Sequence, residues 1–153
     1  MTKLSDSFAS DPFPATATTP SALLEIDNAP FDVTYTFPAK DFGAGANWTE
    51  VIETPAGFRG KVRAITLYDV TEIFNEPTTP AYVYVGISGD TDAYCTSASL
   101  GALAADASDS PALTAGATLI IPANNTVHVT GVAVTGTSPT GIATVAVTIM
   151  YFK

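Results

Sequence analysis

The chain has 153 residues, 46% hydrophobic and 14% charged, which excludes a disordered chain and one too short to form a core. Its 15 acidic and 6 basic side chains give a formal net charge of −9. Nucleic acids and anionic membranes are therefore excluded as partners, because binding to them needs clustered Lys and Arg.

The cysteine count and the hydropathy indicate the compartment in which the protein is made. Cys95 is the single cysteine, so no internal disulfide can form. The sequence has neither a basic segment followed by an apolar run, as in a secretory signal, nor the roughly 18–20 consecutive apolar residues of a membrane span. We expect one globular domain that is made in a cytoplasm.

The first 30 residues are rich in Ser, Thr, Ala, Pro and Asp. Prolines at Asp11-Pro12-Phe13-Pro14 and Thr19-Pro20 disfavour helix and central strand, because proline lacks an N–H and restrains the preceding residue. We expect an extended N-terminal arm over residues 1–30 and a folded domain over residues 31–153. The arm is either a frayed terminus or a segment that orders on a neighbouring protein. In the second case its anchors are the large apolar residues Phe8, Phe13, Leu23 and Leu24.

From Phe31 to Phe152 the sequence predicts consecutive β-strands. Apolar and polar residues alternate over Phe31–Phe37, and Pro38 is expected to end that strand. Further strands are predicted over Trp48–Thr54, Phe58–Phe74, Tyr82–Ser88, Thr118–Ile121, Thr126–Thr135 and Ile142–Phe152. The run over residues 58–74 is too long for one regular strand and should contain a bulge, and Gly131 predicts a bulge in the 126–135 strand.

The middle of the chain has a different pattern. Asp90, Thr91 and Asp92 could cap a short helix over residues 93–104, because their side chains accept hydrogen bonds from first-turn N–H groups. Seven or eight short strands with turns every 8–12 residues indicate an all-β fold. We expect an antiparallel β-sandwich, jelly-roll-like, with at most one short helix.

Side chains able to carry out a reaction are few. A nucleophile and base could only be Cys95 with His128, and His128 reads as a surface or interface residue because it alternates with valines. Glu50 and Glu53 fall on opposite strand faces, which argues against a pair of catalytic acids. We predict no catalytic residue, no cofactor and no enzymatic activity.

Two patterns could mark ligand sites. Asp90, Asp92, Asp106 and Asp109 could converge on Ca²⁺, although turn and capping roles explain the first two. Trp48 with Tyr82 and Tyr84 could form a sugar-stacking platform, although aromatic packing in the core or at an interface explains them better. We predict no metal site.

Three basic side chains lie together at Arg59, Lys61 and Arg63. Period-two spacing puts all three on one face of a strand. This basic stripe is either a solvated strand face or a contact with an acidic protein neighbour.

Four segments carry a resemblance: PAGFRGKV (55–62), VGISGDTDAY (85–94), IPAN (121–124) and SPTGIATV (138–145). They resemble small structural proteins encoded among the head genes of tailed bacteriophages. In those proteins a Pro-Ala-Gly turn opens a strand, a Gly-Asp turn follows, and a hairpin with a Gly- or Pro-rich loop closes the domain. The resemblance spans Phe31 to Phe152 and implies a virion component without catalytic residues.

The leading hypothesis is a non-enzymatic capsid decoration (cement) protein, made in the host cytoplasm and placed on the exterior of the phage head. It would bind the assembled shell and stabilise it through subunit contacts. Its partners would be the major capsid protein and other copies of itself, with a homotrimer favoured. The alternatives are a head spike, a fibre base or tail component, and a carbohydrate-binding β-sandwich module.

Overall fold

The structure, a computed structural model, describes residues 29–43, 45–75, 78–114 and 120–153. The predicted anchors Phe8, Phe13, Leu23 and Leu24 lie outside this part of the chain. Its strands are β1 (Phe31–Asp41), β2 (Trp48–Glu53), β3 (Arg59–Glu72), β4 (Tyr82–Ile87), β5 (Asp90–Ser99), β6 (Ile120–Ile121), β7 (Thr126–Val132) and β8 (Ile142–Phe152). Among the described residues, no helix is long and apolar enough to cross a membrane.

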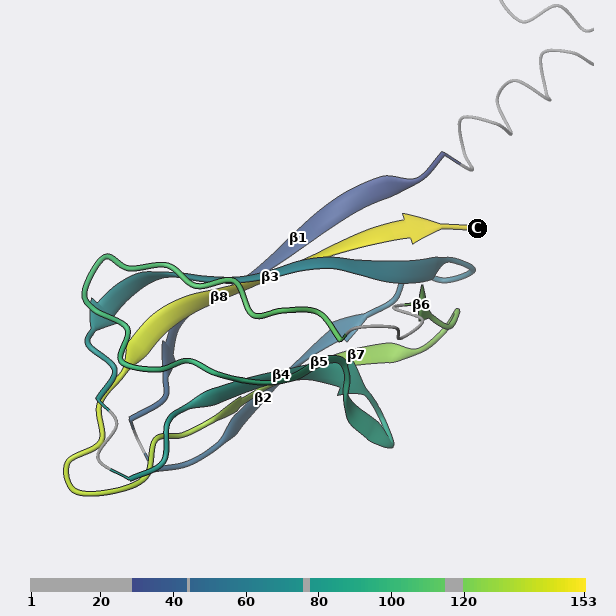
Figure 1. Ribbon diagram of the computed structural model, residues 1–153. Helices are drawn as coiled ribbons and strands as arrows, with labels where there is room; N and C mark the ends of the chain where they lie inside the picture. The colour runs from purple at the N-terminus through teal and green to yellow at the C-terminus, as the bar shows by residue number, and fades with distance from the viewer. Residues whose placement is uncertain (1–28, 44, 76–77, 115–119) are drawn as a thin grey trace, which may run out of the picture.

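The strands form two antiparallel four-stranded sheets that pack face to face (Figure 1). Sheet A has the order β1-β8-β3-β6, and sheet B has the order β2-β7-β4-β5. Four pairings, β1 with β8, β2 with β7, β3 with β6 and β4 with β5, show that the chain folds as one long hairpin wrapped into two sheets. This is the topology of a jelly roll. The predicted fold class is confirmed.

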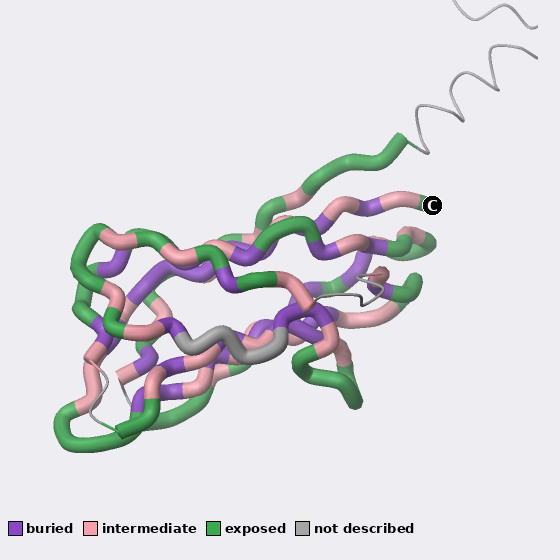
Figure 2. Tube along the Cα trace, in the orientation of Figure 1, coloured by how far each residue is buried: buried purple, intermediate pink, exposed green. Residues whose placement is uncertain are grey.

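The core lies between the sheets, where Figure 2 shows buried segments on the facing strands. The inward face of β8 is fully buried at Val145, Val147, Ile149 and Tyr151, as the alternation predicted. The edge strand β1 has the expected alternation too, with half-buried apolar residues between exposed threonines. The inward side chains of β8 are more deeply buried than those of β1, because β8 has a neighbouring strand on each side and the edge strand β1 has only one.

The bulge predicted in the long third strand is present. The register between β3 and β8 shifts between Val62 and Ala64, and again between Tyr68 and Glu72. The prediction that Pro38 ends the first strand is wrong. β1 continues to Asp41 through another register shift, which a proline can occupy because an edge strand does not need every N–H for pairing.

The predicted helix over residues 93–104 is wrong, because β5 occupies Asp90–Ser99. Gly89, with φ of 90°, closes a two-residue turn that returns the chain directly along β4. Asp90 then pairs with Ile87, and the backbone hydrogen bonds of this segment are made within sheet B rather than within a helix. Tyr94 and Cys95 are buried in the core.

The bulge predicted at Gly131 is also wrong. β7 pairs with β2 and with β4 without a register shift through this residue. Gly131 lies directly opposite Trp48, and a Cβ added to Gly131 would stand 2.1 Å from the indole ring. The glycine is therefore explained by the close approach of Trp48 rather than by backbone geometry.

Candidate interaction surface

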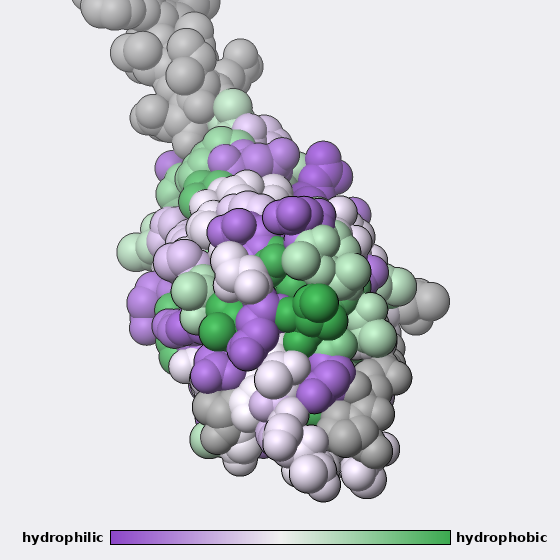
Figure 3. All heavy atoms as spheres, turned by 90° about the vertical axis from the view of Figure 1, so that its left-hand side faces the viewer, coloured by the Kyte–Doolittle hydropathy of each residue, from purple (hydrophilic) through white to green (hydrophobic). Residues whose placement is uncertain are grey.

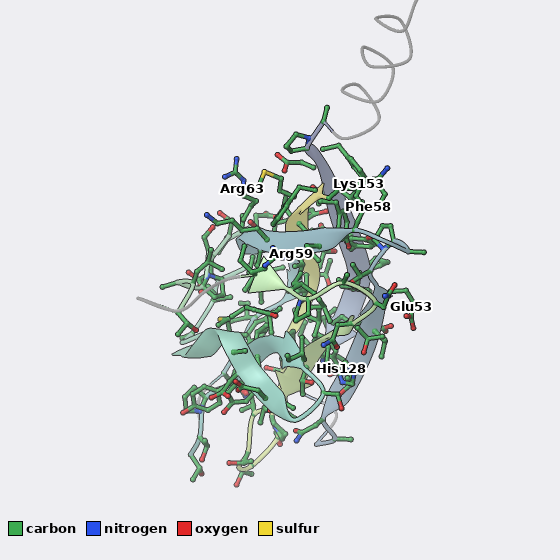
Figure 4. All side chains as sticks on the ribbon, turned by 90° about the vertical axis from the view of Figure 1, so that its right-hand side faces the viewer. Glu53, Phe58, Arg59, Arg63, His128 and Lys153 are labelled. Atoms are coloured by element: carbon green, nitrogen blue, oxygen red, sulfur yellow. The ribbon has the colours of Figure 1, made fainter. Side chains whose placement is uncertain are left out.

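The basic stripe lies on the outer face of sheet A. Gly60 and Val62 are buried, so Arg59, Lys61 and Arg63 all point away from the core, as period-two spacing predicted. Arg63 occupies the register shift that follows Val62, so it is the extra residue of the bulge. In Figure 4, Arg59 lies below Phe58 and Lys153, and Arg63 is set apart from them.

Aromatic rings lie beside two of the basic residues, Arg59 and Lys153, at this end of sheet A. The Arg59 guanidinium lies 5.6 Å from the centre of the Phe152 ring, and the Lys153 ammonium lies 5.3 Å from the Phe58 ring. Phe58 also packs edge-on against Phe31, with ring centres 5.5 Å apart. We call this surface the basic end, formed by Phe31, Phe58, Arg59, Lys61, Phe152 and Lys153.

The opposite end of sheet A is acidic. Asp41 of β1 and Glu72 of β3 both pair with Ile142 of β8, so the two exposed carboxylates flank that residue on the same face. Asp69 and two exposed apolar residues, Tyr68 and Ile73, lie in the adjoining part of the chain. We call this surface the acidic end, formed by Asp41, Tyr68, Asp69, Glu72, Ile73 and Ile142. Figure 3 views this end and shows hydrophobic side chains among hydrophilic ones.

The sequence did not predict these surroundings of the stripe. Period-two spacing identifies which side chains share a strand face, but it does not identify the neighbouring strand. Phe152 lies beside Arg59 because β8 pairs with β3. Asp41 and Glu72 lie near each other because β1 and β3 both pair with β8, at Ile142.

One ion pair joins the two sheets at their β1 and β2 edges. Lys40 donates a hydrogen bond to Oε1 of Glu50, and its ammonium lies 5.2 Å from the centre of the Trp48 ring. Lys40 is therefore engaged, in contrast to Arg59, Lys61, Arg63 and Lys153, none of which pairs with a carboxylate among the described residues. Glu50 points toward β1 and Glu53 is exposed on the other face of β2, as their spacing predicted.

The catalytic alternative raised by the sequence does not form a site. Cys95 is fully buried, with its thiol 3.7 Å from the Val83 carbonyl. His128 is on the outer face of sheet B, where Nε2 lies 3.2 Å from the Thr126 hydroxyl. The sheet backbone therefore separates Cys95 from His128.

The two ligand-site alternatives do not form either. No group of three or more metal-binding side chains occurs among the described residues. Asp90 and Asp92 belong to β5 of sheet B, whereas Asp109 bonds the backbone of Leu67 in sheet A. Trp48 packs inward, opposite Gly131, whereas Tyr82 and Tyr84 stack on the outer face with ring centres 6.4 Å apart. The three aromatic residues therefore do not share a platform.

Two buried tyrosines have perturbed acidity. Tyr151 is fully buried, and its hydroxyl lies 2.9 Å from the Tyr35 hydroxyl. Burial raises the pKa of Tyr151 above its ordinary value, and the hydrogen bond to Tyr35 adds to the shift. Burial and the nearby Asp90 carboxylate raise the pKa of Tyr94 in the same direction. Burial inside the sandwich is the larger cause of both raised pKa values.

No protein-family model and no curated protein matches the sequence. Among solved structures, the chain is similar to a chain of the cyanophage Pam1 capsid asymmetric unit. The sequence identity is 20% and the TM-score is 0.46, over 82% of this chain and 84% of that chain.

Proposed function

We propose that this protein is a non-enzymatic structural component of a tailed-bacteriophage virion, and specifically a capsid decoration protein. The observation that carries the proposal is the strand order of the two sheets, β1-β8-β3-β6 and β2-β7-β4-β5. This is the eight-stranded jelly roll that recurs in viral capsid domains. The turn segments that resemble tailed-phage virion proteins all lie within this sandwich.

The outer faces of the sandwich support a role in protein contact. Thr34 and Thr148 hydroxyls lie 2.9 Å apart on sheet A, and Thr49 and Thr130 hydroxyls lie 3.1 Å apart on sheet B. These neutral cross-strand pairs carry no charge to desolvate, in contrast to the charged ends of sheet A. A neutral patch of this kind can contact a protein partner at low desolvation cost.

The proposed mechanism is stabilisation by mass action. A protein that binds only the assembled shell makes that state more stable, by roughly 3 kcal/mol per site at a free concentration of 100 Kd. The partners are the major capsid protein and other copies of this chain, on the exterior of the head.

Particles that lack this protein should open at a lower temperature, and under weaker osmotic shock, than complete particles. Genome release measured by dye fluorescence during heating checks this, and adding purified protein back to depleted particles should restore the release temperature in a saturable way. Equal stability of depleted and complete particles would contradict the cement role. A low copy number would instead favour a spike or tail component.

Deleting residues 1–22 should leave the sandwich folded, because the core is formed by residues of the two sheets. The truncated protein should bind depleted particles more weakly, since the deletion removes the apolar residues Phe8 and Phe13. Ordering a segment costs roughly 1–2 kcal/mol per residue, so only good contacts would hold it in place. Co-sedimentation with depleted particles checks this. Equal binding by the two chains would identify residues 1–22 as a frayed terminus.

A further inference from the structure

Sheet A has opposite charges at its two ends. Four of the six lysine and arginine residues, Arg59, Lys61, Arg63 and Lys153, lie on β3 or next to the end of β8. β8 runs from Ile142, between the acidic Asp41 and Glu72, to Phe152, beside Arg59. At about 3.3 Å per residue, the two ends are roughly 33 Å apart.

Each end combines its charge with exposed apolar surface. At the basic end Phe31 is 42% exposed and packs against Phe58, and at the acidic end Tyr68 is 39% and Ile73 54% exposed. Three of the four large hydrophobic residues that are exposed in the described part of the chain therefore lie at the ends of sheet A. Exposed apolar residues together with charged residues are the usual composition of a protein–protein interface.

The basic residues form no ion pair among the described residues, although the exposed carboxylate of Asp32 lies on the same face, opposite Met150 as Lys61 does. Arg59 and Lys153 lie over the rings of Phe152 and Phe58, which hold the cations in place without supplying a negative charge. The carboxylates of Asp41 and Glu72 are exposed, and neither pairs with a cation among the described residues. Cations therefore outnumber the carboxylate of Asp32 at the basic end, whereas carboxylates predominate at the acidic end.

We infer that the basic end of one copy binds the acidic end of a second copy, in a head-to-tail contact through sheet A. Such a contact is heterologous, so repetition gives a closed ring if the rotation between copies permits closure and an open chain if it does not. The opposed charges also set the orientation, because two like ends would repel each other. This inference adds to the proposed function the surface through which copies meet, and it does not depend on binding to the shell.

The test measures self-association of the full chain by analytical ultracentrifugation across a concentration series. R59E at the basic end and E72K at the acidic end should each weaken association by about 10-fold, because each replaces an attraction between opposite charges by a repulsion between like charges. Combining R59E and E72K in one chain should restore association to within about 3-fold of the unmodified protein, since the reversed charges at positions 59 and 72 then attract each other across the contact. An equimolar mixture of the two single variants should also associate, because the unmodified basic end of E72K can bind the unmodified acidic end of R59E.

Three controls separate this contact from other effects. D92K, on the β4–β5 hairpin of the other sheet, changes the net charge as E72K does and should leave association unchanged. The unfolding transitions of R59E and E72K should match that of the unmodified protein, since both side chains are exposed. A peptide of residues 1–28 added in excess should not compete, and competition would assign the basic end to that segment and overturn the inference.

The remaining outcomes also decide the question. A chain that stays monomeric up to about 1 mM, weaker than any specific contact of this kind, would overturn the inference. Single variants that weaken association without rescue in the double variant would do the same, because the two ends would then bind different partners. The experiment contains no shell, so its result is independent of the proposed cement role. Copies can associate head to tail even if the protein does not stabilise the shell, and the protein can stabilise the shell even if copies do not associate.

Discussion

Replacing Phe74 by alanine should lower the free energy of unfolding by about 3–5 kcal/mol, the usual cost of removing a buried aromatic ring. Phe74 is 1% exposed, and its ring centre lies 5.1 Å from that of Phe42 in the core. The ring also fills the space beside Gly141, where an added Cβ would stand 2.9 Å from Phe74. The cavity left by the substitution would therefore open between the end of β3 and the start of β8, and neither strand can move to fill it without losing pairing.

The neighbouring residue supplies a matched control. Ile73 is exposed, so Ile73→Ala should change the free energy of unfolding by no more than about 0.5 kcal/mol. Urea unfolding followed by tryptophan fluorescence measures the free energy of unfolding of both variants. In a thermal melt, the midpoint temperature of F74A should fall by roughly 10–20 °C. Similar losses for the two variants would mean that the core does not extend to this end of the sandwich.

Alkaline pH should destabilise the domain through its buried tyrosines. Burial raises the pKa of Tyr151 and of Tyr94 above the value of 10.0 that an unfolded tyrosine has. Below pH 10 both phenols are neutral in the folded and unfolded states, so their contribution to stability is fully present. Above pH 10 the unfolded chain loses these protons while the folded chain keeps them. The free energy of unfolding should then fall by up to about 1.4 kcal/mol per pH unit for each tyrosine.

Urea unfolding at a series of pH values between 8 and 12 measures this slope. Tyr151→Phe removes one of the two phenols, and it should roughly halve the slope above pH 10 while costing about 1 kcal/mol at pH 8 for the lost hydrogen bond to Tyr35. Tyr82→Phe is the matched control, because Tyr82 lies on the outer face of sheet B, and it should leave the slope unchanged. A slope that Y151F does not alter would show that the Tyr151 phenol ionises as easily in the folded protein as in the unfolded chain.

Strand positions were predictable where alternation was strong. Val145, Val147, Ile149 and Tyr151 could be assigned to the core from their spacing, and the structure buries all four. The segment over residues 93–104 was not predictable, because Ala, Ser and Thr have no strong preference there and tertiary pairing with β4 decided its conformation. Gly131 was misread as a bulge because the Trp48 ring that requires a glycine lies on a different strand.

The candidate surface was predictable only in part. The stripe of Arg59, Lys61 and Arg63 followed from period-two spacing, and it does face away from the core. Its aromatic neighbours and the acidic end did not follow, because they depend on the order of strands in sheet A. Alternation reports the face of a strand, whereas strand order is decided by contacts between residues that are far apart in the sequence.

The position of β8 has a consequence for the folding of the growing chain. β8 lies between β1 and β3 in sheet A, yet it follows both of them in the sequence by dozens of residues. Neither β1 nor β3 can complete its pairing before β8 has left the ribosome, which takes on the order of 10 s after β1 emerges. During that time the apolar faces of both strands have no partner sheet. We therefore expect a slow, largely post-translational folding step governed by non-local contacts, with chaperones as the natural protection for the unpaired strands.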